Sequence, residues 1–248
     1  MIPNLSSCKS PQQMFGAMTK TYYAEKMGID PKDIVVVSII PCTAKKFEIS
    51  RENQAASGYP DVDIALTTRE LGRMIERAGI TFTDLPDEEF DAPFAESTGA
   101  GAIFGATGGV MEAALRTAAY ELTGKALDNL DLVDVRGTEG IKEKTYQIGD
   151  LEINVAAASG LANAKELLAR VKSGEKEYHF IEIMACPGGC VNGGGQPVQS
   201  ATTRNSVSYT HLCKKLCGIP DRGQTSGNRH WTGTGNGPAR QGYFRQWL

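Results

Sequence analysis

Long apolar segments are missing from this 248-residue sequence. No run approaches the ~20 apolar residues that a membrane-spanning helix needs. The first eight residues lack the basic segment and apolar core of a signal peptide. These absences predict a cytoplasmic protein without a membrane span, in which thiols stay reduced. The six cysteines are therefore expected to be ligands or packing residues rather than disulfides.

Histidine is also scarce, with three residues in all, and none of them would complete a zinc site. His179 begins a predicted strand, whereas His211 and His230 lie in an atypical tail. Nucleotide-binding signatures are incomplete as well. The glycine-rich segment 99–109 lacks the P-loop lysine, and its third glycine comes one residue too late for the dinucleotide pattern. We interpret this segment as a loop that packs closely beside the cysteine site described below.

Basic charge is sparse over most of the chain. Residues 1–207 hold 20 Lys and Arg against 28 Asp and Glu, whereas residues 208–248 hold six basic residues and one acidic residue. The second segment also contains seven glycines and both tryptophans. This composition predicts disorder more simply than a basic tail that binds nucleic acid. We expect one domain over 1–207, a tail over 208–248, and no nucleic-acid partner.

Two cysteines stand in a glycine-rich loop directly after the apolar run 180–184, which predicts a strand. Cys186 and Cys190 have the spacing C-x3-C, and the loop that holds them contains five glycines. Glycine lets a backbone approach a bulky group closely. Soft thiolate ligands at such a place suit a metal or an iron–sulfur cluster better than they suit packing.

A third cysteine follows a second predicted strand. The run 34–40 is almost continuously apolar and rich in β-branched residues, as in a strand buried on both faces, and it leads into Pro41 and Cys42. Sheets of α/β proteins bind ligands at the carboxyl ends of their strands. We therefore expect Cys42 to belong to the same site as the C-x3-C pair.

Three thiolates are one fewer than structural zinc or a cubane cluster requires. The simpler alternative is that the three cysteines are small buried residues. Lys45 is either a solvated surface lysine or an ammonium donor beside an anionic ligand. Cys8 has no partner at ligand spacing and is assigned a structural role. The repeated C-x3-C spacing of Cys213 and Cys217 is assigned to chance because neither glycine nor a strand accompanies it.

Strands alternate with helices along the chain, which indicates an α/β fold with mainly parallel sheet. Capping signals start two of the helices, at Ser10-Pro11 and at Thr67-x-x-Glu70. Gly149 and Asp150 predict a tight turn. The predicted strands are 34–40, 63–66, 132–135, 151–156 and 180–184. The predicted helices are 10–28, 67–78, 110–122 and 161–171.

The cysteine segments resemble the catalytic domain of [FeFe]-hydrogenases. Segment 40–48, Ile-Pro-Cys-Thr-Ala-Lys-Lys-Phe-Glu, is similar to the second signature motif of that family, and segment 184–197 is similar to the third. Segments 4–13, 66–71 and 99–110 are also similar, so the resemblance covers about residues 2–207. It implies an α/β iron hydrogenase fold with two lobes of mainly parallel sheet, flanked by helices, and the cluster site between the lobes.

The resemblance implies reversible reduction of protons to H2 with electrons from a ferredoxin-type donor. The implied cofactor is the H-cluster, a [4Fe-4S] cluster bridged to a two-iron subcluster. Cys42 and Cys186 would hold the cubane, and Cys190 would bridge its two parts. Lys45 would donate a hydrogen bond to a cyanide ligand, and Met184 would pack on the two-iron subcluster.

Further roles follow from the same resemblance. Ser6 would lie on the proton path. Electron-transfer subunits or ferredoxin, together with hydrogenase maturation proteins, would be partners in anaerobic hydrogen metabolism. The remaining cofactor-binding positions would be Phe104, Gly105, Pro41 and Gln196.

Three departures accompany the resemblance. A Thr-Ser-Cys-Cys-Pro type motif, which would supply the fourth cubane ligand and a proton-shuttling thiol, would stand upstream of Asn4. The tail from about Ser208 no longer resembles the family, and Ile40 replaces the usual methionine. The first two departures predict a chain truncated at its N-terminus with a frameshifted or chimeric end.

Two alternatives remain for the function. The first is a hydrogenase-like carrier or assembly protein for iron–sulfur clusters without H2 activity. The intact Pro187, Gly188 and Gly189 and the presence of Lys45 favour the enzyme over this alternative. The second is a sensory relative of the hydrogenases that is coupled to a signalling domain.

Overall fold

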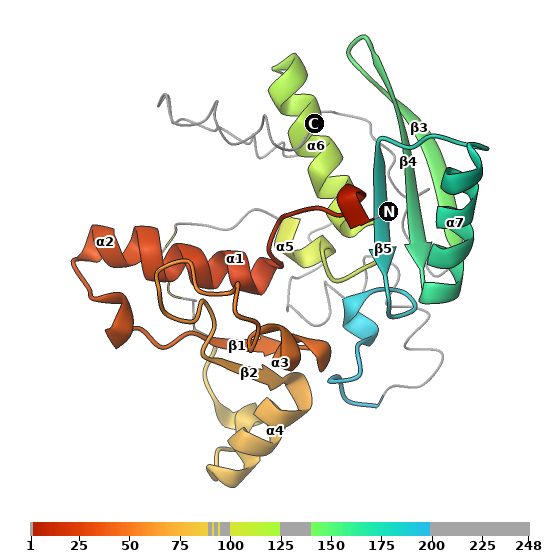
Figure 1. Ribbon diagram of the computed structural model, residues 1–248. Helices are drawn as coiled ribbons and strands as arrows, with labels where there is room; N and C mark the ends of the chain where they lie inside the picture. Colours follow the sequence, from red (N-terminus) through yellow and green to blue (C-terminus); the bar gives the residue numbers. More distant parts are fainter. Residues whose placement is uncertain (1, 89–90, 92–93, 95–99, 125–139, 199–248) are drawn as a thin grey trace.

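The computed structural model describes residues 2–88, 91, 94, 100–124 and 140–198, and its elements form two lobes (Figure 1). The predicted strand 132–135 and the tail with Cys213 and Cys217 lie outside the described residues. A π-helical turn, Thr19–Tyr23, joins the first two helices. The helices and strands are α1 (Pro11–Met18), α2 (Ala24–Met27), β1 (Val37–Ile40), α3 (Ala44–Glu48), β2 (Ile64–Thr67), α4 (Thr68–Arg77), α5 (Ala100–Ile103), α6 (Gly109–Thr123), β3 (Ile141–Ile148), β4 (Leu151–Ser159), α7 (Leu161–Ser173) and β5 (Phe180–Met184).

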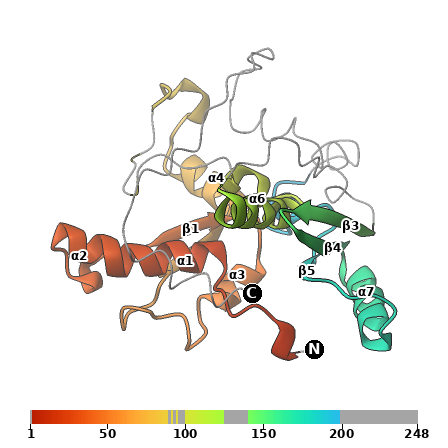
Figure 2. The same ribbon diagram turned by 90° about the horizontal axis from the view of Figure 1, so that it is seen from above.

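The first lobe is built on β1 and β2, which pair in parallel with Val37 opposite Ile64. Helices α1 and α4 lie on opposite sides of this pair (Figures 1 and 2). Strand β1 starts at Val37, three residues later than predicted. Just before it, the Val36 amide donates to the Asp63 carboxylate at 2.7 Å, so a side chain takes the place of a strand partner. Parallel pairing aligns the carboxyl ends of β1 and β2 at one edge.

The second lobe is a three-stranded sheet in the order β3-β4-β5, with α6 and α7 on opposite faces. Strands β4 and β5 are parallel, and β3 and β4 form an antiparallel hairpin through the predicted turn at Gly149. Alternate residues of β4 point to opposite faces of the sheet, and each set packs against one of the two helices. Val155 and Ala157 pack with Met111 of α6, whereas Ala156 and Ala158 pack with Leu167 of α7.

Strand β3 and helix α3 were not predicted. β3 reads Ile-Lys-Glu-Lys-Thr-Tyr-Gln-Ile and is mostly polar. Among the described strands it pairs with β4 alone, and three of its eight residues are exposed. Helix α3 is only five residues long, too short for periodicity to indicate it. The α/β class is confirmed, with one antiparallel pairing added to the parallel ones.

Helix α1 and its continuation through α2 to Gly28 match the predicted helix, and Gly28 ends it with a left-handed φ of 67°. The buried face of this helix differs from the face marked by Met14, Met18 and Tyr22, which recur at intervals of four residues. Met14 and Met18 are exposed, whereas Lys20 is buried and pairs with Asp63 at 2.7 Å. Ser10 occupies the N-cap position but makes no capping hydrogen bond, because its hydroxyl donates to Glu48.

Candidate metal centre

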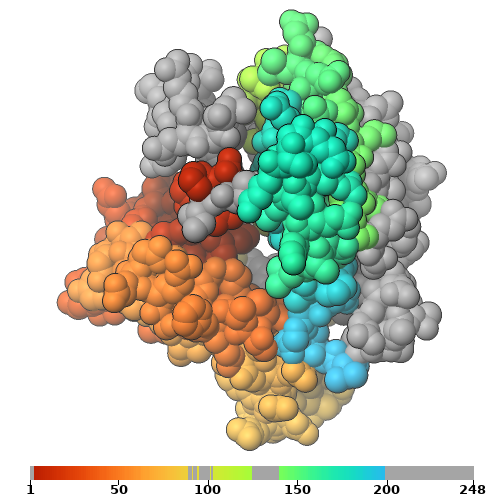
Figure 3. All heavy atoms as spheres, turned by 45° about the vertical axis from the view of Figure 1, so that its right-hand side comes forward, coloured from red at the N-terminus to blue at the C-terminus, as the bar shows by residue number. Residues whose placement is uncertain are grey.

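Strands β1 and β5 each carry cysteine just beyond their carboxyl ends. Cys42 follows β1, and Cys186 and Cys190 follow β5. The loop after β5 crosses to the first lobe, where the Gly195 amide donates to the Pro41 carbonyl at 2.8 Å. The Gly195 carbonyl in turn accepts from the Arg69 amide at 3.1 Å. Figure 3 shows this blue loop between the two lobes. The sheet edges therefore bring the predicted ligands to one junction.

Glycine is required at two positions of this loop. A Cβ atom on Gly193 would lie 2.3 Å from the Pro41 carbonyl oxygen, so any side chain would separate the lobes. Gly189 has a φ of 107°, and its Cβ would lie 2.4 Å from the Gly105 oxygen. The first contact brings the loop against the Cys42 segment, and the second brings it against segment 104–108. The glycines predicted to allow close approach therefore meet backbone on both sides.

The three cysteines are free thiols, and the Cys190 thiol lies within electrostatic range of Cys42, Cys186 and Lys45. Burial raises the pKa of Cys190, and Cys42 and Cys186 raise it further, whereas Lys45 acts in the opposite direction. The Cys190 Sγ atom lies 3.9 Å from the Met184 Sδ atom. The predicted cluster ligands Cys42, Cys186 and Cys190 therefore lie in one region of the structure. Lys45, the predicted cyanide donor, and Met184, predicted to pack on the two-iron subcluster, lie in the same region.

Lys45 is held by a carboxylate. Its Nζ atom donates to Glu48 Oε1 at 2.6 Å, while Ser10 Oγ and Gln12 Nε2 each donate to Glu48 Oε2 at 2.7 Å. Burial raises the pKa of Glu48, but these three hydrogen bonds outweigh it and leave the pKa below its ordinary value. The side-chain carbonyl of Gln12 accepts a hydrogen bond from the Ser38 hydroxyl on β1 at 2.7 Å. Glu48 therefore stays ionised and anchors Lys45 to α1 and the sheet.

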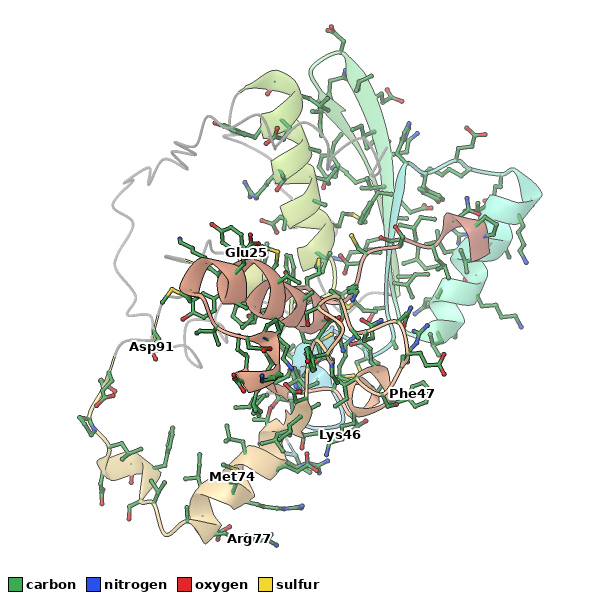
Figure 4. The ribbon with its side chains drawn as sticks, turned by 60° about the vertical axis from the view of Figure 1, so that its left-hand side comes forward. Glu25, Lys46, Phe47, Met74, Arg77 and Asp91 are labelled. Carbon is green, nitrogen blue, oxygen red and sulfur yellow. The ribbon has the colours of Figure 1, made fainter. Side chains whose placement is uncertain are left out.

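Lys46, the neighbour of Lys45, faces a different element. It pairs with Glu70 of α4 at 2.6 Å, and Figure 4 shows Lys46 and Phe47 at the surface near α4. Phe47 is 75% exposed. Of the two lysines in the motif, Lys45 is thus the one that lies on the site.

Segment 104–108 packs on the cysteine loop as predicted for a close-approach loop. The Gly105 carbonyl accepts from the Val191 amide at 3.0 Å, and the Thr107 amide donates to the Gly188 carbonyl at 3.3 Å. Glu182 of β5 secures the start of α6 by accepting from the Gly108 amide at 2.6 Å and the Met111 amide at 2.8 Å. Burial raises the pKa of Glu182 despite these bonds.

The other predicted site residues differ in their exposure to solvent. Phe104 is half-buried next to Gly105. Gln196 is also half-buried, and its backbone amide donates to the Gly193 carbonyl at 3.0 Å. Ser6 is exposed, and its hydroxyl accepts from the Cys8 amide at 3.2 Å. Cys8, assigned a structural role, is itself exposed.

The chemistry of the site fits an anionic cluster. Within the described ranges, no three His, Cys, Asp or Glu side chains converge closely enough to hold one metal ion. The thiolates of a cubane each bind a different iron, so they stand farther apart than the ligands of one zinc ion. The Lys45 ammonium, the apolar Met184 and the glycine backbone of the loop suit a bulky group with negative charge.

Sequence reasoning missed Glu48, Gln12 and Glu182 as members of the site. Glu182 is the only charged residue in the apolar strand Phe180–Met184, and a lone carboxylate there is a signal for a specific buried partner. Glu48 stands three residues after Lys45, which is pairing distance on a helix. Gln12 carried no local signal, because its partners lie 26 and 36 residues away.

Comparison with known proteins places this geometry in a family. Residues 1–194 match the family model described as iron only hydrogenase large subunit, C-terminal domain. The NADP-reducing hydrogenase subunit HndD of Solidesulfovibrio fructosivorans is 56% identical over 210 residues, covering 82% of this chain and 36% of that protein. The periplasmic [Fe] hydrogenase large subunit of Nitratidesulfovibrio vulgaris is 54% identical over 221 residues, covering 87% and 52%.

More distant relatives have another role by name. A cytosolic Fe-S cluster assembly factor of Xenopus tropicalis is 34% identical over 201 residues, covering 79% of this chain and 42% of that protein. Among solved structures, a variant of [FeFe]-hydrogenase HydA1 from Chlamydomonas reinhardtii superimposes with a TM-score of 0.67 at 42% identity, covering 84% of this chain and 60% of that one.

The chain thus spans about a third to a half of the length of these curated relatives. No helix in the described part of the chain is both long and apolar enough to cross a membrane. The family match over 194 residues, the identities above 50% and the shared fold agree with the cysteine junction. The chain belongs to the iron-only hydrogenase family and corresponds to the C-terminal domain of its large subunit.

Proposed function

We propose that this chain provides the cluster-binding part of a hydrogenase that catalyses 2 H+ + 2 e− ⇌ H2. The observation that carries the proposal is the backbone contact between the Pro41-Cys42 segment and the loop that holds Cys186 and Cys190, with Lys45 in electrostatic range of Cys190. Hydrogenase relatives above 50% identity support it. When bound, an H-cluster supplies an iron centre at which H2 is formed or split.

Each residue of the site would have a distinct task. Cys42 and Cys186 would hold the [4Fe-4S] part, and Cys190 would join it to the two-iron subcluster. Lys45, kept in place by Glu48, would donate a hydrogen bond to a cyanide ligand. Met184, which lies against the Cys190 sulfur, would exclude water from the two-iron subcluster.

The remaining predicted positions would complete the pocket. Pro41, Phe104, Gly105 and Gln196 would line it, since they lie on the segments that contact the cysteine loop. Ser6, which is exposed at the surface, would be part of the proton path.

The proposal includes partners and a location. A ferredoxin or another electron-transfer subunit would deliver electrons, and maturation proteins would insert the two-iron subcluster. A cytoplasmic location stays a prediction; one of the relatives is named as a periplasmic subunit.

Cluster binding is tested by anaerobic reconstitution of the chain with iron and sulfide. The wild-type chain and a Cys8→Ser control should take up a cluster with an electron paramagnetic resonance signal after reduction, because Cys8 is an exposed thiol outside the two cysteine motifs. Cys42→Ser and Cys186→Ser should lose most of the bound iron. Equal iron content in all four proteins would refute the assigned ligands.

The alternative of cluster carriage or assembly is separated by a second step. Loading the reconstituted chain with a synthetic two-iron complex should give infrared bands of bound CO and cyanide, and H2 evolution with reduced methyl viologen. Cys190→Ser should lose the bands and the activity. A chain that keeps its cubane but never retains the two-iron complex would instead match the assembly-factor relatives.

A further inference from the structure

A buried hydroxyl beside the cysteine loop has no partner within the described part of the chain. Thr107 is 2% exposed, and its Oγ1 atom forms no hydrogen bond there. Burying a hydroxyl without a partner costs desolvation free energy, so such groups are normally paired. An orphaned hydroxyl at the edge of a ligand site therefore indicates a partner that belongs to the ligand.

Thr107 lies against the middle of the cysteine loop. Its amide donates to the Gly188 carbonyl at 3.3 Å and would lie 2.6 Å from a Cβ atom on Gly189. Gly188 and Gly189 belong to the three residues between Cys186 and Cys190. The Thr107 backbone therefore lies against the segment that joins the two proposed ligands.

The neighbouring backbone amides are already engaged. Those of Gly108 and Met111 donate to Glu182, and that of Gly188 donates to Ser159 Oγ at 3.1 Å. The Gly189 amide donates to the Cys186 carbonyl at 2.9 Å. The hydroxyl is thus not needed to cap α6, whose N-cap residue is Gly108. Within the described ranges its proton has no acceptor, so it is available to a bound ligand.

We propose that the Thr107 hydroxyl donates a hydrogen bond to a sulfur of the iron–sulfur cluster held by Cys186 and its partner cysteines. The inference rests on the proposed function and adds a residue that tunes the cluster. Reduction adds negative charge to the cluster, and a donor to one of its sulfurs stabilises that charge. Hydrogen bonds to cluster sulfurs therefore raise the reduction potential.

Two matched variants test the role of the hydroxyl. Thr107→Val removes it at nearly constant volume, and Thr107→Ser keeps it. After reconstitution with iron and sulfide, each chain is titrated under a series of applied potentials and followed by electron paramagnetic resonance. Thr107→Val should have a more negative midpoint potential and a several-fold smaller reduced fraction at the wild-type midpoint. Thr107→Ser should recover the wild-type value.

Urea unfolding of the cluster-free chains supplies a readout independent of the cluster. Thr107→Val should be at least as stable as wild type, because the hydroxyl it removes has no partner among the residues that the structure describes. Failure of this variant to fold, or a clear loss of its cluster-free stability, would overturn the inference by giving the hydroxyl a structural role. Equal midpoint potentials in loaded wild type and Thr107→Val would overturn it too, leaving the proposed function intact. A wild-type chain that binds no cluster would overturn both.

Discussion

Two carboxylates near the junction have pKa values shifted in opposite directions, although burial acts to raise both. Glu48 gathers three hydrogen bonds, including one from the Lys45 ammonium, and these lower its pKa in spite of partial burial. Glu182 is more deeply buried and accepts only from backbone amides at the start of α6, so burial dominates and raises its pKa. The same residue type thus holds a cation at one wall of the site and a helix N-terminus at the other.

Glu182→Gln should reveal the raised pKa through the dependence of stability on pH. A raised folded-state pKa contributes stability that is complete below the ordinary glutamate pKa of 4.5 and is lost as pH rises through the folded-state pKa. The wild-type chain should therefore lose stability relative to the variant from pH 4.5 upward, with a slope of at most about 1.4 kcal/mol per pH unit. Urea unfolding at several pH values measures the difference. The opposite trend would mean that the amide bonds outweigh burial.

At the scale of elements, α4 has the most complete start signal in the described chain. The Thr67 hydroxyl accepts from the Glu70 amide, while the Glu70 carboxylate accepts from the Thr67 amide at 2.8 Å. Lys46 and these Thr67 contacts lower the pKa of Glu70 to about 2. The helix begins at the junction, since the Arg69 amide bonds to the cysteine loop. The cap therefore also positions a contact of the site.

Thr67→Ala should weaken α4 by about 1 kcal/mol, because it removes the N-cap acceptor. Thr68→Ala, one residue into the helix, is the matched control and should cost much less. Unfolding by urea measures both, and nuclear magnetic resonance should show the pKa of Glu70 rising from about 2 towards its ordinary value in Thr67→Ala alone. Stability contributed by Glu70 is present above pH 4.5 and is lost as pH falls towards 2. Equal stabilities of the two variants would show that the capping box contributes nothing.

At the scale of the whole molecule, the site depends on close approach of the two lobes. Pro41 and the loop at 193–195 meet through backbone atoms, so the spacing between Cys42 and the C-x3-C pair depends on this backbone contact. Thr67 adds to the same junction, because its Cβ would lie 2.7 Å from a Cβ on Gly195. A small increase in volume at this point should separate the ligands of one cluster.

Gly193→Ala tests this close approach without backbone strain, because the φ of Gly193 is −61°. The added methyl group meets the Pro41 carbonyl, so we expect a loss of roughly 1–3 kcal/mol in unfolding free energy and much weaker retention of iron after reconstitution. Gly194→Ala is the control, since its nearest contact would be the Thr43 hydroxyl at 3.9 Å. Iron retention by Gly193→Ala equal to that of Gly194→Ala would rule out the proposed spacing.

Local spacing in the sequence was sufficient for several features of the fold and site. The run 180–184 and the cysteines after it predicted a strand that ends at ligands, and Thr67 with Glu70 predicted a helix start; the structure contains both elements. The glycines of the cysteine loop predicted close approach to a bulky group; the structure adds that Gly189 and Gly193 closely approach other backbone segments. These features depend on residues within a few positions of one another, so their physical cause lies in the sequence itself.

Other features depend on partners far along the chain, and only the tertiary structure decided them. Lys20 is buried because Asp63 stands 43 residues away to pair with it, although the apolar spacing of α1 lies on another face. Glu182 binds amides more than 70 residues away, and Ser10 donates to Glu48 instead of capping its own helix. A polar group is buried only where its partner is, and the position of that partner is a property of the fold. The sequence by itself determined which residues are candidate cluster ligands, and the approach of the two lobes decided that the segments carrying them meet.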